Sequence, residues 1–402
     1  MEVRSIRLLA ALVCSGLAAC APVGPNDSVT ESTVGPTPST PTTSLAPIST
    51  ATTLTSTTQP IAGLEPIEVG PLEIRGGHSV VWSDGEMIVW GGEGDEAGST
   101  LFSDGAAYDP DEDSWRLLAA APLSGRRNHV AAWTGDEMLI VGGVDERDGA
   151  SYEPKSDTWT QIAESPIPVG PGPGAPIEGA VGWVWTGSEL AVWHTATDQL
   201  ASYRPNTDEW SLLPPTGFQG DGVLRWDGEA VHAFATTTSD YPSDVAEAAR
   251  LTDGRWTPLA PSEFSTETYI VSAVPKLTAW AGDRFLAWSG SGSDGKTLSF
   301  RPGDDAWTEM QPIPLPPCEG QGEPVQADGQ VFAFGWCGPN AATFDHASET
   351  WESFTVTGYP TARTTVWTGT ELLNWGDTCC YGTGGAPFTS VDAWRLEPRA
   401  EP

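Results

Sequence analysis

The stretch 78–92, which reads HSVVWSDGEMIVWGG, decides the fold of this chain. It places two apolar segments, 78–82 and 86–90, on either side of Asp84-Gly85. Glycine tolerates a positive φ, and an Asp-Gly pair between apolar segments is a strong signal for a tight hairpin turn. The doublet Gly91-Gly92 then ends the second segment. The stretch therefore predicts two antiparallel strands joined by a tight turn.

The same turn recurs through the chain, and between 40 and 54 residues separate consecutive copies. The copies are Trp82-Ser83-Asp84-Gly85, Trp133-Thr134-Gly135, Trp185-Thr186-Gly187, Trp226-Asp227-Gly228, Trp280-Ala281-Gly282, the degenerate Ala327-Asp328-Gly329, and Trp367-Thr368-Gly369. Self-similarity at this period is typical of a repeat protein in which each repeat is one supersecondary unit. Seven copies predict seven repeats.

Each repeat continues into a second hairpin that carries two aromatic residues at a constant spacing. The pairs are Tyr108/Trp115, Tyr152/Trp159, Tyr203/Trp210, Phe300/Trp307 and Phe344/Trp351. Two hairpins supply four strands, which is one blade of a β-propeller. We expect the large rings to pack between neighbouring blades, with their polar tips bonded to a partner. A sugar-binding platform is the alternative for any one of them.

The repeats resemble those of the kelch family, which also occur in galactose-oxidase-like propellers. The matching elements are the doublets Gly91-Gly92 and Gly142-Gly143 after an apolar strand, followed by the spaced Tyr and Trp. The resemblance covers about residues 64–398 and is strongest in the first two repeats; the doublet becomes Trp193-His194 in the third. It implies an all-β fold, a seven-bladed kelch-type β-propeller with four-stranded blades.

The last repeat lacks a fourth strand, which bears on how the ring closes. Residues 391–398 resemble a third strand, with Trp394 where Tyr108 stands in the first repeat. We therefore predict that residues 64–69 form the missing outer strand, so that both chain ends share one blade and no edge is left open to other chains. In the alternative, Trp394 is the seventh outer tryptophan and residues 64–69 are a plain lead-in.

The N-terminal residues resemble an export signal followed by a linker. Residues 1–20 resemble a bacterial lipoprotein signal peptide, with a basic start, a short apolar run and a lipobox-like Leu17-Ala18-Ala19-Cys20. The run is too short for a transmembrane helix. We expect an exported protein, anchored to the bacterial membrane by lipid on Cys20 and facing the extracytoplasmic side; an ordinary secretory signal is the alternative. Residues 21–62, rich in Ser, Thr and Pro, predict a disordered linker. The propeller is assigned to residues 63–398 and a short tail to 399–402.

The net charge limits the kinds of partner that the protein can bind. The chain has 402 residues and a net charge of −35, which disfavours nucleic acid and anionic membrane surfaces. We expect membrane contact through the lipid alone, and we expect the protein to be a monomer.

Cys318 and Cys337 straddle the turn at Asp328-Gly329, which predicts a disulfide in an oxidising compartment. The adjacent Cys379 and Cys380 form either a vicinal disulfide or two thiols.

Chain direction assigns the loops to two faces of the ring. The first face carries the turns after the first and third strands of each blade, and the second face carries the loops after the second strand and between blades. The variable lengths fall on the second face, in the ranges 93–104, 164–178, 236–246, 262–274 and 377–388. Variable loops on a rigid scaffold are typical binding surfaces. We therefore expect a glycan or protein ligand on the second face.

Four arginines precede inner strands of blades one, two and seven, which are neighbours in a closed ring: Arg75, Arg126, Arg127 and Arg363. The planar guanidinium suits carboxylate, sulfate or phosphate. We predict a site for an anionic ligand, an acidic glycan or an acidic protein segment, with His78 and His129 at its entrance. The alternative is that the arginines pair with loop acids such as Glu93, Asp95, Asp145, Glu146 or Asp377.

Motifs for catalysis are incomplete in this sequence. It has no Gly-x-Ser-x-Gly elbow, no His-Glu-x-x-His helix and no phosphate-binding loop. The copper ligands of galactose-oxidase-like propellers transfer to no residue here, and the Asp boxes of a sialidase-like propeller are missing. We assign no catalytic or metal-ligating residue and predict no particular cofactor. The first hypothesis is a binding or scaffolding module, and the alternative is a carbohydrate-active enzyme of the oxidase or sialic-acid-processing type.

Overall fold

The computed structural model describes residues 64–94, 100–170, 181–218, 222–237, 244–259, 262–264, 278–289, 296–304, 306–315, 324–327, 329–334, 340–356, 364–377 and 391–396. All of them belong to one compact unit, residues 56–402. The predicted signal peptide with Cys20, the linker 21–62, the tail 399–402, Arg363 and the four cysteines Cys318, Cys337, Cys379 and Cys380 lie outside the described residues. Within the described part, no helix is long and apolar enough to cross a membrane.

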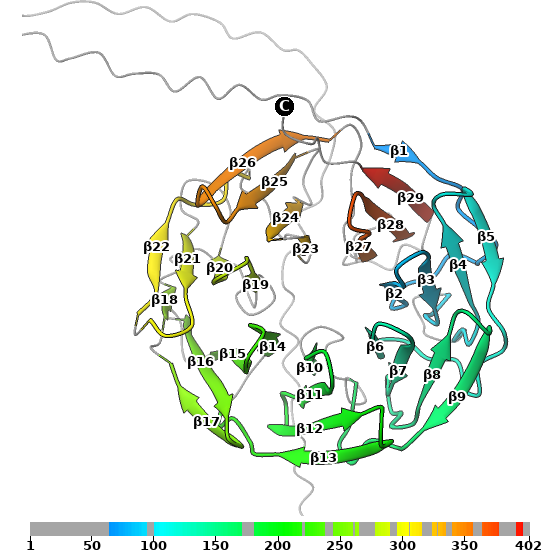
Figure 1. The fold of residues 1–402 in the computed structure, drawn as a ribbon, viewed down its shortest axis with the longest axis horizontal. Helices are drawn as coiled ribbons and strands as arrows, with labels where there is room; N and C mark the ends of the chain where they lie inside the picture. The colour runs from blue at the N-terminus through cyan, green and yellow to red at the C-terminus, as the bar shows by residue number, and fades with distance from the viewer. Residues whose placement is uncertain are drawn as a thin grey trace, which may run out of the picture. The chain divides into compact units, whose positions relative to one another are not determined.

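Seven antiparallel sheets stand around a ring, each with its first strand nearest the centre (Figure 1). The prediction of an all-β, seven-bladed propeller with four-stranded blades is therefore confirmed. Blade one comprises β2 (Ser79–Trp82), β3 (Met87–Trp90), β4 (Gly105–Asp109) and β5 (Ser114–Leu117). Blade two comprises β6 (Val130–Trp133), β7 (Met138–Val141), β8 (Gly149–Glu153) and β9 (Thr158–Ile162). Blade three comprises β10 (Val181–Trp185), β11 (Leu190–His194), β12 (Gln199–Arg204) and β13 (Glu209–Leu213).

The later blades keep this order. Blade four comprises β14 (Gly222–Trp226), β15 (Val231–Thr237), β16 (Asp244–Thr252) and β17 (Arg255–Pro258), with β18 (Ser262–Phe264) as a fifth strand against β16. Blade five comprises β19 (Thr278–Trp280), β20 (Phe285–Ser289), β21 (Lys296–Phe300) and β22 (Thr308–Met310). Blade six comprises β23 (Val325–Ala327), β24 (Gln330–Phe334), β25 (Asn340–Asp345) and β26 (Thr350–Thr355). Blade seven comprises β27 (Thr365–Trp367), β28 (Leu372–Asp377), β29 (Val391–Leu396) and β1 (Glu65–Pro66).

Blade four corrects two of the predicted loops. The ranges 236–246 and 262–274 were assigned to loops, but β15 and β16 continue into the first range and β18 begins the second. The reason is that the β15–β16 ladder extends past the length of its counterparts, with Thr236 opposite Ala246 and Thr237 opposite Val245. β18 then pairs with the extended end of β16.

The Trp-led turns close as predicted, but the positive φ falls on the first central residue, which is Asp84 rather than Gly85 in the first repeat and Gly135 in the second. In the first repeat the Ser83 N–H donates to the Glu86 carbonyl at 2.9 Å, and Asp84 has a φ of 59°. The second repeat has the same closure from Thr134 to Glu137 at 2.9 Å. These short turns give the first-face ends of blades one and two the same closure.

The outer-strand tryptophans join each blade to the one before it. The indole N–H of Trp159 donates to the Ala119 carbonyl at 2.9 Å, and Trp210 does the same to Ala163 at 2.9 Å. Tyr152 packs against Trp159 with ring centroids 4.9 Å apart. The expectation that the aromatic rings pack between blades with bonded polar tips is met at these positions.

The ring closes through β1, as predicted. Glu65 pairs with Arg395 and Pro66 with Trp394, and the Ile67 N–H donates to the Ala393 carbonyl at 3.1 Å. The Glu68 carbonyl accepts the indole N–H of Trp115 at 2.8 Å, as Ala119 does for Trp159. The lead-in therefore acts as the outer strand of blade seven. The alternative, with Trp394 on the outer strand, is wrong.

The register of β29 corrects one detail of that prediction. Leu372 pairs with Leu396 in blade seven as Met87 pairs with Tyr108 in blade one. Leu396 thus occupies the place of Tyr108, and Trp394 lies two residues earlier along the strand. Trp394 is buried there against Phe334 of blade six, with ring centroids 6.1 Å apart. Packing with the preceding blade, rather than the spacing to a partner on the same blade, sets its position.

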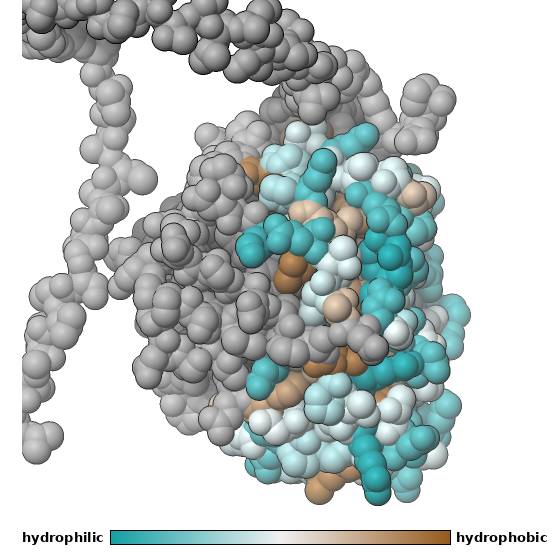
Figure 2. Space-filling view, turned by 90° about the vertical axis from the view of Figure 1, so that its left-hand side faces the viewer, coloured by the Kyte–Doolittle hydropathy of each residue, from teal (hydrophilic) through white to brown (hydrophobic). Residues whose placement is uncertain are grey.

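The described surface is mainly hydrophilic on the side of the ring that carries β22, with apolar residues scattered among polar ones (Figure 2). Exposed large apolar side chains include Leu117 and Leu212, on the outer strands of blades one and three. Isolated apolar residues of this kind are normal on a soluble domain.

Candidate ligand-binding face

Arg75 is buried at the start of blade one, and its donors are used within the protein. Its Nη1 contacts Asp104 Oδ1 at 2.7 Å and donates to the Gly91 carbonyl at 3.1 Å, while its Nε donates to the Glu73 carbonyl at 3.0 Å. The guanidinium carbon lies 4.0 Å from the centre of the Phe102 ring. These contacts tie the loop after β3 to the segment that enters β2.

Arg126 repeats this arrangement in blade two. Its Nη1 contacts Asp148 Oδ1 at 2.7 Å and donates to the Gly142 carbonyl at 3.0 Å. Its Nε donates to the Ser124 carbonyl at 3.1 Å. Only 1% of the Arg126 side chain is exposed. A guanidinium bonded in this way holds the second-face rim of the blade and has little surface left for a ligand.

The acids that partner these two arginines were not among those named from the sequence. Asp104 and Asp148 each stand directly before the glycine that begins the third strand, at Gly105 and Gly149. This shared position in two repeats was the available signal. The separations from arginine to aspartate along the chain differ between the two repeats, so the pairing has no constant spacing.

Arg127 differs from its neighbour because its side chain is 23% exposed. Its Nη1 bonds the carboxylate of Glu93 at 2.6 Å, a pairing that the sequence analysis left open. Glu93 belongs to blade one and is itself buried, and its backbone exchanges hydrogen bonds of 2.8 and 2.9 Å with Gly76. The Nε and Nη2 of Arg127 make no hydrogen bond with the described residues. Arg127 therefore links blade two to blade one and keeps two donors without a partner among the described residues.

The two histidines each bond the preceding blade. His78 Nε2 lies 3.2 Å from the Trp375 carbonyl of blade seven, and His129 Nε2 lies 2.8 Å from Ser79 Oγ of blade one. Burial, with the nearby positive charge of Arg75, lowers the pKa of His78 to about 4. Burial, with the charge of Arg126, lowers the pKa of His129 to about 3. Both rings are therefore neutral at neutral pH.

The structure thus gathers five of the six predicted site residues at the second-face end of blades one and two, beside Trp375 of blade seven. They are Arg75, His78, Arg126, Arg127 and His129, and the sixth, Arg363, lies outside the described residues. The three arginines face three carboxylates, those of Asp104, Asp148 and Glu93. This part of the surface can therefore present hydrogen-bond donors without a large excess of positive charge.

Comparisons with known proteins bear on the fold. No family model matches the chain, and no curated protein matches it in sequence. A fungal alcohol oxidase of the AA5 family, determined in complex with copper, is similar in structure: the TM-score is 0.53, the identity is 12%, and the match covers 82% of this chain and 76% of that one. The chain is therefore a seven-bladed β-propeller of the galactose-oxidase-like, kelch-type fold.

At this identity the likeness extends to the fold alone. Among the described residues, no group of three or more His, Cys, Asp or Glu side chains could hold a metal ion. His78 and His129 turn one ring nitrogen each to a carbonyl and a hydroxyl.

Proposed function

We propose that this protein is an exported binding module, tethered by lipid on Cys20, whose second face recognises a glycan or protein ligand. The supporting observation is the pair of Arg–Asp contacts, 2.7 Å in both blades, that fix the second-face rim. A preorganised rim lowers the cost of ordering a binding surface. The opposite face has short turns of one geometry, which offer less variety for recognition.

We assign the recognition of an anionic group, an acidic glycan or an acidic protein segment, to Arg127 together with Arg363. Arg127 carries the free donors Nε and Nη2 among the described arginines of this sector. Its bond to Glu93 holds the guanidinium in place, and the planar fork suits a carboxylate or sulfate oxygen. His78 and His129, in the same sector, remain neutral, so they add no charge.

Replacing Arg127 with alanine is expected to weaken binding of an acidic glycan at least tenfold. A hydrogen bond to a charged group contributes about 1.5–3 kcal/mol, and about 1.4 kcal/mol corresponds to a factor of ten. The ligand is first selected on a glycan array and then titrated by calorimetry at two salt concentrations, since binding of this kind weakens as salt rises.

The matched control for this variant is Lys155→Ala, which removes one positive charge from the first face. Lys155 is 81% exposed and only 3.9 Å from Asp136, so its loss tests net charge alone. Equal affinity of the Arg127→Ala variant and the parent protein would contradict the assignment.

Replacing Cys20 with alanine is expected to release the protein from membranes, because a lipoprotein carries its lipid on that cysteine. The measurement is partitioning between detergent and aqueous phases, with Cys14→Ala as the control that keeps the anchor. A Cys20→Ala protein that still enters the detergent phase would refute the anchoring.

The carbohydrate-active enzyme is the second candidate, and its support is the structural likeness to the alcohol oxidase. Metal analysis of the purified protein tests the oxidase form of this candidate, and assay with sialosides tests the sialic-acid-processing form. A stoichiometric copper ion would favour an oxidase, and a metal-free protein that still binds its ligand would favour the binding module.

A further inference from the structure

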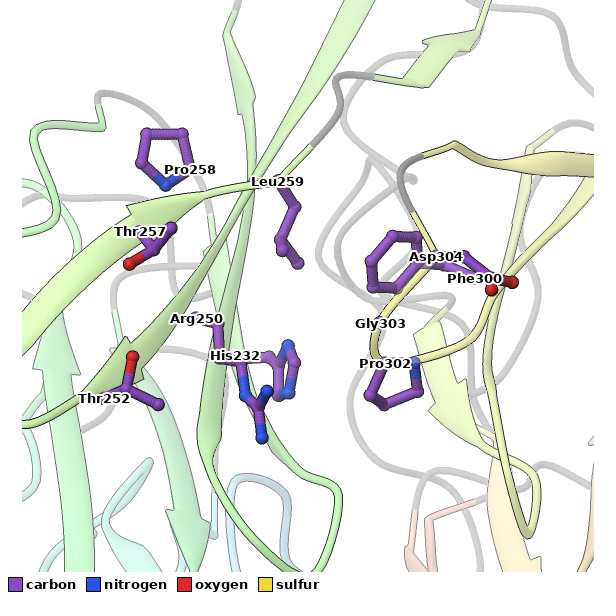
Figure 3. A pocket seen from close by; sticks show the side chains of 10 residues that line it. All are labelled: His232, Arg250, Thr252, Thr257, Pro258, Leu259, Phe300, Pro302, Gly303 and Asp304. Atoms are coloured by element: carbon purple, nitrogen blue, oxygen red, sulfur yellow. The ribbon is translucent and has the colours of Figure 1, made fainter.

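A pocket of about 300 Å³ lies between blades four and five (Figure 3). His232 and Arg250 line it from β15 and β16 of blade four. Phe300 and Pro302 line it from the end of β21 and the following turn of blade five, and Leu259 covers a further side. The pocket adjoins the first-face turn of blade five, away from the sector of Arg127.

Strand registers show which positions meet in this pocket. Leu251 pairs with Trp256 as Tyr108 pairs with Trp115, so Arg250 stands one residue before the place of Tyr108 in its own blade. In blade five, Phe300 pairs with Phe285 as Tyr108 pairs with Met87. Phe300 therefore occupies the place of Tyr108, facing the arginine of the preceding blade.

Blades seven and one contain the same two positions with a tyrosine. Arg395 stands one residue before Leu396, as Arg250 stands before Leu251. Its Nη2 donates to the Tyr108 hydroxyl at 2.7 Å and to the Pro110 carbonyl at 3.2 Å. Between blades four and five the hydroxyl is missing, because the ring is that of Phe300. The pocket lies at the position where, between blades seven and one, an arginine donates to a tyrosine hydroxyl. Between blades four and five this hydrogen bond is absent.

Polar atoms around this space lack hydrogen-bond partners. Arg250 Nε is buried and has no hydrogen-bond partner, while Nη2 has ion-pair contacts with acids but no aligned hydrogen bond. His232 is fully buried, and its Nε2 bonds Asp227 Oδ2 at 2.8 Å. With Nε2–H donating to that carboxylate, the imidazole keeps Nδ1 as an acceptor, and Nδ1 has no partner. A buried donor or acceptor without a partner destabilises the protein, so a ligand that satisfies both Arg250 Nε and His232 Nδ1 gains free energy on binding.

The charges around the pocket disfavour an anion. Arg250 Nη2 lies 3.1 Å from Glu229 Oε2 and 3.9 Å from Asp227 Oδ2, so two carboxylates already face the one guanidinium. Asp304 adds a third acid to the lining. A neutral hydroxyl suits this environment better, because it accepts from Arg250 and donates to His232 without bringing further negative charge.

We propose that the pocket binds a neutral polyol of monosaccharide size, with one hydroxyl in the place that the tyrosine hydroxyl occupies between blades seven and one. Thr252 and Thr257 offer further hydroxyls, and Leu259 and Pro302 offer apolar surface for C–H groups. The volume is at the lower end of the range for small-molecule sites, about 300–1,000 Å³. This site is separate from the second face and does not depend on the function proposed for it.

The test is titration of the full chain with glucose, galactose and myo-inositol, and with glucuronate as an anionic counterpart, by calorimetry and saturation-transfer NMR. We expect saturable binding of at least one neutral polyol and weaker binding of glucuronate. Phe300→Tyr supplies the missing hydroxyl from the protein, so it should lower the affinity at least tenfold and raise the melting temperature.

Phe344→Tyr is the matched control, because Phe344 holds the same position in blade six. There the preceding blade, blade five, has Ser299 in the place that Arg250 holds in blade four. It should leave polyol binding unchanged. Should Phe300→Tyr fail to fold, Arg250→Met takes its place and should also lower the affinity at least tenfold. Failure of all three neutral polyols to bind, equal affinity in the Phe300→Tyr variant, or preference for glucuronate would each overturn the proposal. Arg127→Ala should leave polyol binding intact, which separates this site from the second face.

Discussion

Replacing Arg126 with alanine is expected to destabilise the propeller by about 3 kcal/mol. Removing one partner of a buried ion pair costs about 3–5 kcal/mol, and the lower end applies because Asp148 is 33% exposed and is partly solvated once its partner is lost. The carbonyls of Gly142 and Ser124 also lose a donor. The measurement is the free energy of unfolding from urea titration.

Two controls separate this effect from ligand binding. Arg127→Ala removes the neighbouring arginine, whose side chain is more exposed, and should cost less stability. Lys155→Ala removes a nearly free surface charge and should leave the unfolding midpoint unchanged. A protein with Arg126→Ala that keeps its stability but loses affinity for an acidic ligand would mean that Arg126 reaches the ligand, against the contacts described above.

Removing the closing strand is expected to have the largest effect on the fold. A chain that begins at Gly70 lacks β1, the buried side chain of Ile67 and the Glu68 carbonyl that accepts the Trp115 indole. Burial of a side chain such as isoleucine contributes about 1.5–3 kcal/mol, and each lost hydrogen bond about 1 kcal/mol. Three hydrogen bonds are lost, from the Ile67 N–H to Ala393 and from the indoles of Trp115 and Trp375 to the carbonyls of Glu68 and Val69. With these counted, we expect a loss of about 5 kcal/mol.

The shortened chain should also associate, because β29 becomes an open edge that pairs with other chains. Thermal melts and light scattering measure the two effects, and a chain that begins at Leu64 and keeps β1 is the control. A chain starting at Gly70 that melts with the control and stays monomeric would show that β1 contributes little to closure.

Local sequence carried most of the information about the ring. An Asp-Gly or Thr-Gly turn between two apolar segments needs only neighbouring residues, so Asp84 and Gly85 specify their hairpin wherever it lies. The closing strand was also predictable, because a missing outer strand after Trp394 left one strand to be supplied by residues 64–69. The register of β29 could not be predicted from the sequence, because Trp394 and Leu396 are both apolar. Only packing against blade six selects which of the two occupies the place that Tyr108 holds in blade one.

The sequence by itself determined the seven repeats, the strand order within each blade, the two loop faces and the second-face sector of blades one and two. Only the tertiary structure decided which arginines are buried, because Arg126 and Arg127 are adjacent in sequence and face different partners, Asp148 in the same blade and Glu93 in the blade before. It also decided that Arg250 and Phe300 line a pocket between blades four and five, whereas Arg395 donates to the Tyr108 hydroxyl between blades seven and one. Both outcomes depend on contacts between segments far apart in the chain, and such contacts follow from strand register and blade packing rather than from any local pattern.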